Sequence, residues 1–162
     1  MHLQPLSLFF SPSIAPNAKA IISTMGVNGS TALIAKDTNS LCLPIKGMDD
    51  SATQLWVEIE TLLSSLHDKM TTHKTEMIDG VMFDYFTCSS FQIHDNVLFS
   101  INSGTDSTGC GDRFIAGVIY AILSGAKSWQ SVLVFGSVIA KIGMHITPLT
   151  INIVMEVLNK FM

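Results

Sequence analysis

The chain has 162 residues, which is enough for one domain with a buried core. Its formal net charge of −4 and its charged fraction of only 14% exclude the basic surface that binding to nucleic acid requires. A mean hydropathy of +0.42 predicts strands buried on both faces or a surface that another molecule covers, although no apolar run reaches membrane-spanning length.

The N-terminal residues 1–18 contain three prolines and predict an irregular lead-in to a domain that spans residues 19–162. Residues 19–26 form a mainly apolar run that ends at a glycine, which predicts a buried strand. A turn at 27–30 and a second strand at 31–35 follow. Taken alone, this pattern is that of a hairpin.

An amphipathic helix is expected within residues 46–79. Ser51 and Gln54 have the spacing of a capping box at its start. Apolar side chains then recur at helical spacing, namely Leu55, Ile59, Leu62, Leu63 and Leu66. We interpret it as a helix that packs on the core, with a docking helix as the alternative.

Two short β-rich runs follow at residues 81–86 and 91–101, with a turn expected at Asp95-Asn96. The C-terminal third predicts three helices. The first runs from the region of Phe114 to a stop at Gly125, because Phe114, Val118, Ala121 and Ile122 share one helix face. The other two are expected at 129–142 and, after Pro148, at 149–161.

No metal cluster is expected from the spacing of the cysteines or histidines. Cys42, Cys88 and Cys110 form no CxxC pair, and His67, His73 and His94 share no ligand spacing. The odd number of cysteines favours a reducing, cytoplasmic setting. The apolar N-terminus lacks the basic residues of a secretory signal.

The most distinctive stretch runs from Gly104 to Phe114 and reads Gly-Thr-Asp-Ser-Thr-Gly-Cys-Gly-Asp-Arg-Phe. It predicts a glycine-rich loop that opens into a helix, whose first amides lack partners within the helix and can hold a phosphate. Asp112 follows in the first turn, where a carboxylate can accept a proton from an attacking hydroxyl. The alternative is that Asp106, Ser107 or Asp112 merely caps the helix.

The run Asp106–Asp112, followed by Phe114 and Ala116-Gly117, resembles the C-terminal motif of the ribokinase/PfkB carbohydrate kinase family, Asp-Thr-Thr-Gly-Ala-Gly-Asp. Cys110 replaces the usual small residue. The resemblance implies an α/β, ribokinase-like three-layer sandwich. It also implies transfer of a phosphoryl group from ATP, with Mg²⁺, to a hydroxyl of a sugar or nucleoside.

The same resemblance implies roles for individual residues. Asp112 would be the catalytic base, and the amides of Gly109, Cys110 and Gly111 would form an anion hole. Asp106 and Thr108 would help to hold a monovalent cation such as K⁺.

Two further segments would lie near the nucleotide by this resemblance. The strand–turn–strand at 19–36 contains Thr24, Gly26 and Gly29 in a Thr-x-Gly-x-x-Gly pattern, which the family places near the phosphates or ribose. In the helix at 129–142, Gly136, Ser137 and Ala140 would border the adenine pocket.

The resemblance covers residues 19–36 and 98–160, which correspond to the C-terminal half of a family member. The N-terminal half, with its sugar-binding motif and β-sheet lid, has no counterpart, and residues 46–97 form a divergent insertion. We therefore keep an alternative: a non-catalytic nucleotide-binding remnant, or one half of a split kinase that needs a separate N-terminal-half chain or a homo-oligomer. A vitamin-type kinase acting on a pyrimidine or pyridoxal alcohol is a third interpretation.

Overall fold

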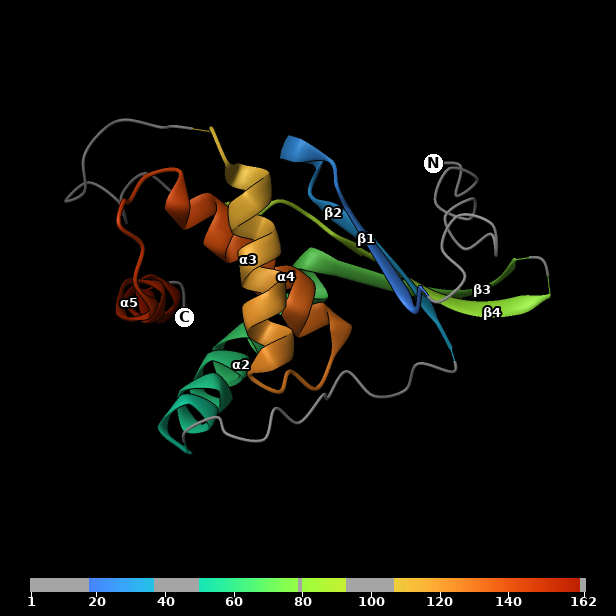
Figure 1. The fold of residues 1–162 in the computed structure, drawn as a ribbon, viewed down its shortest axis with the longest axis horizontal. Coiled ribbons are helices and arrows are strands. Elements are labelled where there is room, and N and C mark those ends of the chain that lie inside the picture. Colours follow the sequence, from blue (N-terminus) through green and yellow to red (C-terminus); the bar gives the residue numbers. More distant parts are fainter. Residues whose placement is uncertain (1–17, 37–49, 79, 93–106, 161–162) are drawn as a thin grey trace.

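The computed structural model describes residues 18–36, 50–78, 80–92 and 107–160 (Figure 1). They form a sheet and a group of helices beside it (Figure 1). In chain order the elements are β1 (Ala20–Thr24), the short 3-10 helix η2 (Gly26–Asn28), β2 (Ser30–Ala35), α2 (Asp50–Met70), β3 (Thr71–Ile78), β4 (Val81–Cys88), α3 (Cys110–Leu123), α4 (Trp129–Gly143) and α5 (Ile151–Lys160).

The four described strands pair in the order β1-β2-β4-β3, and every pair is antiparallel. The predicted strands at 19–26, 31–35 and 81–86 are confirmed as β1, β2 and β4. All six residues of β2 are buried, as the high hydropathy of the chain predicts. The prediction that β1 is buried is wrong, because β1 is an edge strand and is largely half-buried.

The predicted helices are confirmed as α2, α3, α4 and α5, with ends that differ by a few residues. Gly125 follows the end of α3 with a φ of +90°, a conformation that glycine adopts readily. Of the predicted run 91–101, Phe91 and Gln92 lie outside any strand, and the rest lies outside the described residues. Among the described helices, none is long and apolar enough to cross a membrane.

The strands alternate between two faces of the sheet. From β2 and β4, the side chains of Ala32, Ile34, Phe86 and Cys88 join the helices in the main hydrophobic core. The intervening residues form a smaller cluster on the other face: Leu33, Ala35, Phe83 and Tyr85, with Ile78 packed beside them. No described helix joins this second cluster, so the three-layer sandwich implied by the resemblance is not seen among the described residues.

The described part of the segment at 46–97 contributes to both the core and the sheet. Its helix α2 places Trp56, Ile59 and Leu63 in the main core, and its strand β4 is central in the sheet. From the sequence, only a helix is predicted within residues 46–79. The strand β3, which follows this helix at Thr71–Ile78, is therefore missed. This edge strand is mostly exposed and carries polar side chains on both faces, so its sequence lacks apolar alternation.

Two glycines allow α3 and α4 to pack closely. A Cβ on Gly117 would lie 3.0 Å from the Cα of Gly136, and a Cβ on Gly136 would lie 2.9 Å from the ring of Phe114. Such contacts are tighter than side chains normally make, so glycine at both positions brings the two backbones together. The N-terminus of α3 is thereby held against the C-terminal half of α4.

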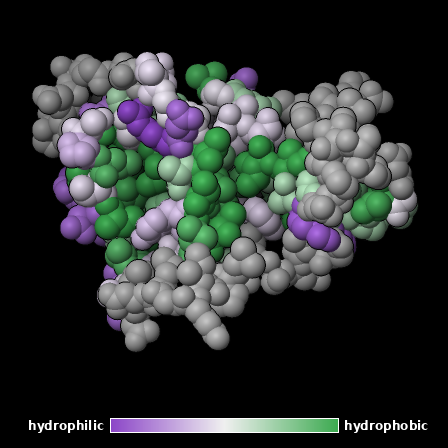
Figure 2. All heavy atoms as spheres, in the orientation of Figure 1, coloured by the Kyte–Doolittle hydropathy of each residue, from purple (hydrophilic) through white to green (hydrophobic). Residues whose placement is uncertain are grey.

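The exposed face of α3 is apolar instead of polar. Beyond its first turn, its exposed positions are Ile115, Ala116, Ile119 and Leu123. Figure 2 shows hydrophobic residues gathered over α3. This face accounts for part of the high mean hydropathy of the chain, because a helix on a protein surface normally turns polar residues outward.

His67 joins the end of α2 to the start of α4. Its Nε2 lies 3.2 Å from the Oγ of Ser131, and the Ser131 amide in turn donates to the Oγ of Ser128, the N-cap of α4. Burial lowers the pKa of His67 below its usual 6.5, although Glu60 and Asp68 act in the opposite direction. The fold therefore favours the neutral imidazole.

We expect the free energy of unfolding to fall as the pH is lowered below about 6.5, because the unfolded chain protonates His67 before the folded chain does. The stabilisation is complete above 6.5 and is lost as the pH falls through the lowered pKa. The substitution His67→Gln should flatten this part of the pH dependence. Urea unfolding at several pH values measures it, and equal slopes for the two proteins would contradict the assignment to His67.

Candidate functional site

A cavity of about 290 Å³ lies where the β1–β2 turn meets the N-terminus of α3 and the C-terminal half of α4. This volume is close to the lower end of the range for small-molecule sites. The described residues that line it are Thr24, Gly26, Val27, Gly29, Ser90, Gln92, Ser107, Cys110, Gly111, Phe114, Ser137, Ala140, Lys141 and Met144. Backbone amides, hydroxyls and apolar side chains are thus exposed to one space.

Half of these residues are among those that the sequence predicts for a nucleotide site. They come from three separate segments of the chain, and they are Thr24, Gly26, Gly29, Cys110, Gly111, Ser137 and Ala140. The remaining predicted residues are not part of the lining. Thr108, Gly109, Asp112 and Gly136 lie elsewhere, and Asp106 lies outside the described residues.

The β1–β2 turn supplies one wall of the cavity through its backbone. The amide of Met25 donates to the carbonyl of Gly29 at 2.8 Å, and the amide of Gly29 donates to the carbonyl of Gly26 at 3.0 Å. Both glycines have positive φ, +57° at Gly26 and +92° at Gly29. The turn therefore depends on glycine for its shape.

Gly29 also allows the turn to approach the end of β4. A Cβ at this position would overlap the carbonyl oxygen of Cys88 and would lie 2.9 Å from the backbone carbons of Ser89. No such crowding exists at Gly26, where a Cβ would meet nothing within 4 Å. Gly26 is thus required for its backbone conformation alone, whereas Gly29 is required both for its conformation and for the close approach to β4.

The glycine-rich loop enters α3 through Gly109. This residue is the N-cap and adopts the left-handed conformation, with φ +75° and ψ +11°. The amide of Cys110 donates to the carbonyl of Ser107 at 3.1 Å, and the amide of Arg113 donates to the carbonyl of Gly109 at 2.9 Å. The Cys110 amide is therefore engaged within the loop, whereas the amides of Gly111 and Asp112 have no acceptor within the helix.

The surroundings of Gly111 are open. A Cβ built on this residue would meet nothing within 4 Å, although the residue lines the cavity. An incoming phosphate could therefore approach the backbone here, at the positive end of the α3 dipole.

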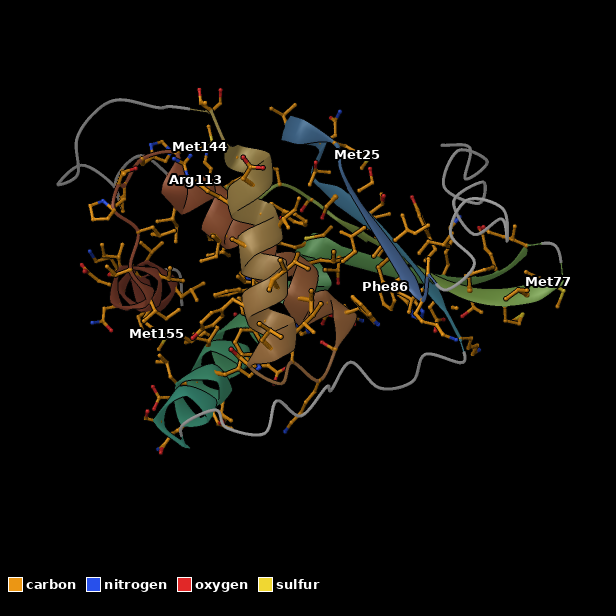
Figure 3. All side chains as sticks on the ribbon, in the orientation of Figure 1. Met25, Met77, Phe86, Arg113, Met144 and Met155 are labelled. Carbon is orange, nitrogen blue, oxygen red and sulfur yellow. The ribbon has the colours of Figure 1, made fainter. Side chains whose placement is uncertain are left out.

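Arg113 connects the loop to the end of α4. Its Nη1 donates to the carbonyl of Thr108 at 3.0 Å, and its side chain lies against the backbone of Gly143. Figure 3 shows Arg113 and Met144 at the same end of the two helices. The cationic side chain of Arg113 therefore lies at the Thr108 carbonyl, and the role of Thr108 as a ligand for a monovalent cation stays a prediction.

Asp112 lies on the exposed side of the first turn of α3. A carboxylate at this position interacts favourably with the helix dipole, which is a sufficient structural role for it. Ala116 and Ile119 follow it on the same helix face. The predicted base is thus accessible, but it adjoins the exposed apolar face of α3 and not the cavity.

The α4 wall contributes Ser137 and Ala140, while Gly136 serves the contact with α3. The Oγ of Ser137 lies 3.7 Å from the Sγ of Cys88, and the Sγ of Cys110 lies 4.0 Å from the carbonyl oxygen of Ala140. Gly136 was expected at the adenine pocket, but it is buried against the ring of Phe114. Gly136 thus contacts Phe114, which itself lines the cavity, and the next residue, Ser137, also belongs to the lining.

Seven lining residues are not predicted from the sequence as site residues: Val27, Ser90, Gln92, Ser107, Phe114, Lys141 and Met144. Phe114 was assigned to the helix core, and one side of its ring does pack there. Ser90 and Gln92 reach the cavity only because β4 ends beside the β1–β2 turn, which no local pattern encodes. Lys141 could have been noticed in the sequence, because it is the only charged residue of α4.

Among the described residues, no group of three or more His, Cys, Asp or Glu side chains is arranged to hold a metal ion. No protein-family model, curated protein or solved structure significantly matches the chain. The function must therefore be inferred from the sequence motif and the geometry of the cavity.

We expect Gly29→Ala to lower the free energy of unfolding by about 3 kcal/mol or more, because it combines backbone strain with overlap at the Cys88 carbonyl. The matched variant Gly26→Ala should cost about 1–2 kcal/mol, since only the left-handed backbone disfavours it. Chemical denaturation of both variants measures the difference. Equal costs would show that the turn does not approach β4 as described.

The two described cysteines should differ in reactivity. Burial raises the pKa of the Cys88 thiol to about 11, although the hydroxyls of Ser137 and Ser30 oppose this, so it remains a protonated, buried thiol at neutral pH. Cys110 is half-buried and lines the cavity. Iodoacetamide should therefore modify Cys110 first in the folded protein, as peptide mass mapping would show. Faster modification of Cys88 would contradict the description.

Proposed function

We propose that the chain is a ribokinase-like domain that binds Mg·ATP in this cavity and transfers the γ-phosphoryl group to a hydroxyl of a sugar or nucleoside. The observation that supports the proposal most strongly is the convergence of the two resembling segments. The Thr-x-Gly-x-x-Gly turn and the start of the glycine-rich helix are about eighty residues apart, yet both line one cavity.

The lining of the cavity fits a nucleotide. Gly26 and Gly111 leave the backbone open where phosphates would approach, because a side chain at neither position would meet other atoms. Phe114, Val27 and Met144 supply apolar surface for a base, and Ser137 supplies a hydroxyl. Mg²⁺ would arrive with the ATP phosphates, which together with water provide most of its ligands in such sites.

The amides of Gly111 and Asp112 would then stabilise negative charge on the transferred group, since they point from the start of α3 without acceptors in the helix. The carboxylate of Asp112, exposed in the same turn, would take the proton of the acceptor hydroxyl. The acceptor would bind on the exposed side of this turn, where Asp112 is accessible.

A second candidate is nucleotide binding without transfer by this chain alone. It is favoured by the position of Asp112, which is not part of the cavity lining, and by the apolar face of α3 beside it. A domain of this kind would need a partner chain or a second copy to complete an acceptor site. The two candidates share the nucleotide cavity and differ in what Asp112 does.

Titration calorimetry with Mg·ATP tests the proposal. The wild type should bind, and Gly111→Val should lose at least about tenfold in affinity, because the added side chain fills the cavity beside the phosphate amides. Ala116→Val is the matched control, since it introduces the same valine side chain on the outer face of α3 and should leave binding unchanged. The folding of all variants can be compared by thermal unfolding.

The variant Asp112→Asn separates the two candidates. It should bind Mg·ATP nearly as well as the wild type but should lose phosphoryl transfer to a sugar or nucleoside panel. A folded wild-type chain that does not bind Mg·ATP would refute both candidates. Binding without transfer by the wild type would favour the non-catalytic candidate.

A further inference from the structure

We infer that Lys141 is the residue that supplies positive charge to the phosphate groups of the nucleotide. The inference rests on the proposed function and identifies a contact that the sequence motif does not include. Lys141 lies in the last turn of α4 and is half-buried. Among the described residues that line the cavity, it is the only charged one.

The position of Lys141 is set by the packing of α3 on α4. The Sγ of Cys110 lies 4.0 Å from the carbonyl oxygen of Ala140, and the side chain of Arg113 lies against Gly143. Cys110 and Arg113, in the first turn of α3, therefore contact α4 one residue before Lys141 and two residues after it. Lys141 and Gly111 consequently line the same cavity.

This arrangement places two positive features together. The N-terminus of α3 carries the positive end of a helix dipole, and Lys141 adds a full charge beside it. The structure records no ion pair between Lys141 and any other described residue. In a chain with a net charge of −4, a cation beside the N-terminus of α3 favours an anionic ligand in this cavity.

Lys141 also lies at the C-terminus of α4, where a cation stabilises the helix whether or not a ligand is present. This structural role predicts an effect on stability alone. A role in phosphate binding predicts instead an effect that grows with the number of phosphates on the ligand. The two roles can therefore be separated by ligands that differ only in their phosphates.

The experiment compares the binding of Mg·ATP, ADP and adenosine to the wild type and to Lys141→Met by calorimetry. The variant should weaken Mg·ATP binding by about tenfold or more and ADP binding by less, while adenosine binds equally to both proteins. Lys141→Arg should retain most of the affinity. Lys69→Met, which removes the same charge from the exposed end of α2, should change none of the three affinities.

Equal affinities of the wild type and Lys141→Met for Mg·ATP would overturn this role of Lys141 and leave the nucleotide cavity in place. An equal loss for all three ligands would also overturn it, because the lysine would then support the cavity and not the phosphates. A wild type that binds adenosine and ATP equally would refute a phosphate site altogether. Failure of the wild type to bind any of the three would refute the proposed function itself.

Discussion

The close contact between α3 and α4 is the constraint on which the candidate site depends. Gly117 and Gly136 let the two backbones approach, and the ring of Phe114 fills the space beside Gly136 before reaching the cavity. This packing fixes the start of α3 next to the last turns of α4. The N-terminal amides belong to α3, and Lys141 belongs to α4. They lie close together because Gly117 and Gly136 have no side chains that would hold the two helices apart. A phosphate site here would thus depend on the packing of α3 against α4 as much as on the glycine-rich loop before α3.

The sheet brings the β1–β2 turn, which is the second wall of the cavity, next to the helices, and this approach also depends on a glycine. Gly29 lets the β1–β2 turn reach the carbonyl of Cys88 at the end of β4, and β4 packs on α4 through the main core. The cavity therefore forms where three segments meet, each with a glycine at the point of approach. Asp112 stands apart from this arrangement, on a helix face whose exposed side chains are apolar. The cavity is thus formed by the described residues, and the proposed base lies on an exposed helix face outside its lining.

Much of this could be predicted from the sequence where a local pattern determines the structure. Helical periodicity located α2 to α5, and apolar runs located β1, β2 and β4, because each of these elements has a buried face. The strand β3 was missed because an exposed edge strand such as Thr71–Ile78 carries no apolar alternation. The glycine motifs and the family resemblance together identified half of the cavity lining, but Ser90, Gln92 and Lys141 belong to it only through tertiary contacts. Gly136 was assigned to the cavity although packing against Phe114 explains it, since a sequence does not show which side of a helix a glycine serves.

The central claim is that the β1–β2 turn and the start of α3 form one nucleotide site. Amide hydrogen exchange with and without Mg·ATP tests it most directly, because it reports on both segments in one experiment. The account predicts slower exchange at Gly26–Gly29 and at Gly111–Asp112 together, with no change at the far end of the β3–β4 hairpin, at Met77, Ile78 and Val81. Unchanged exchange in both segments at a saturating nucleotide concentration, or protection confined to other parts of the chain, would contradict it.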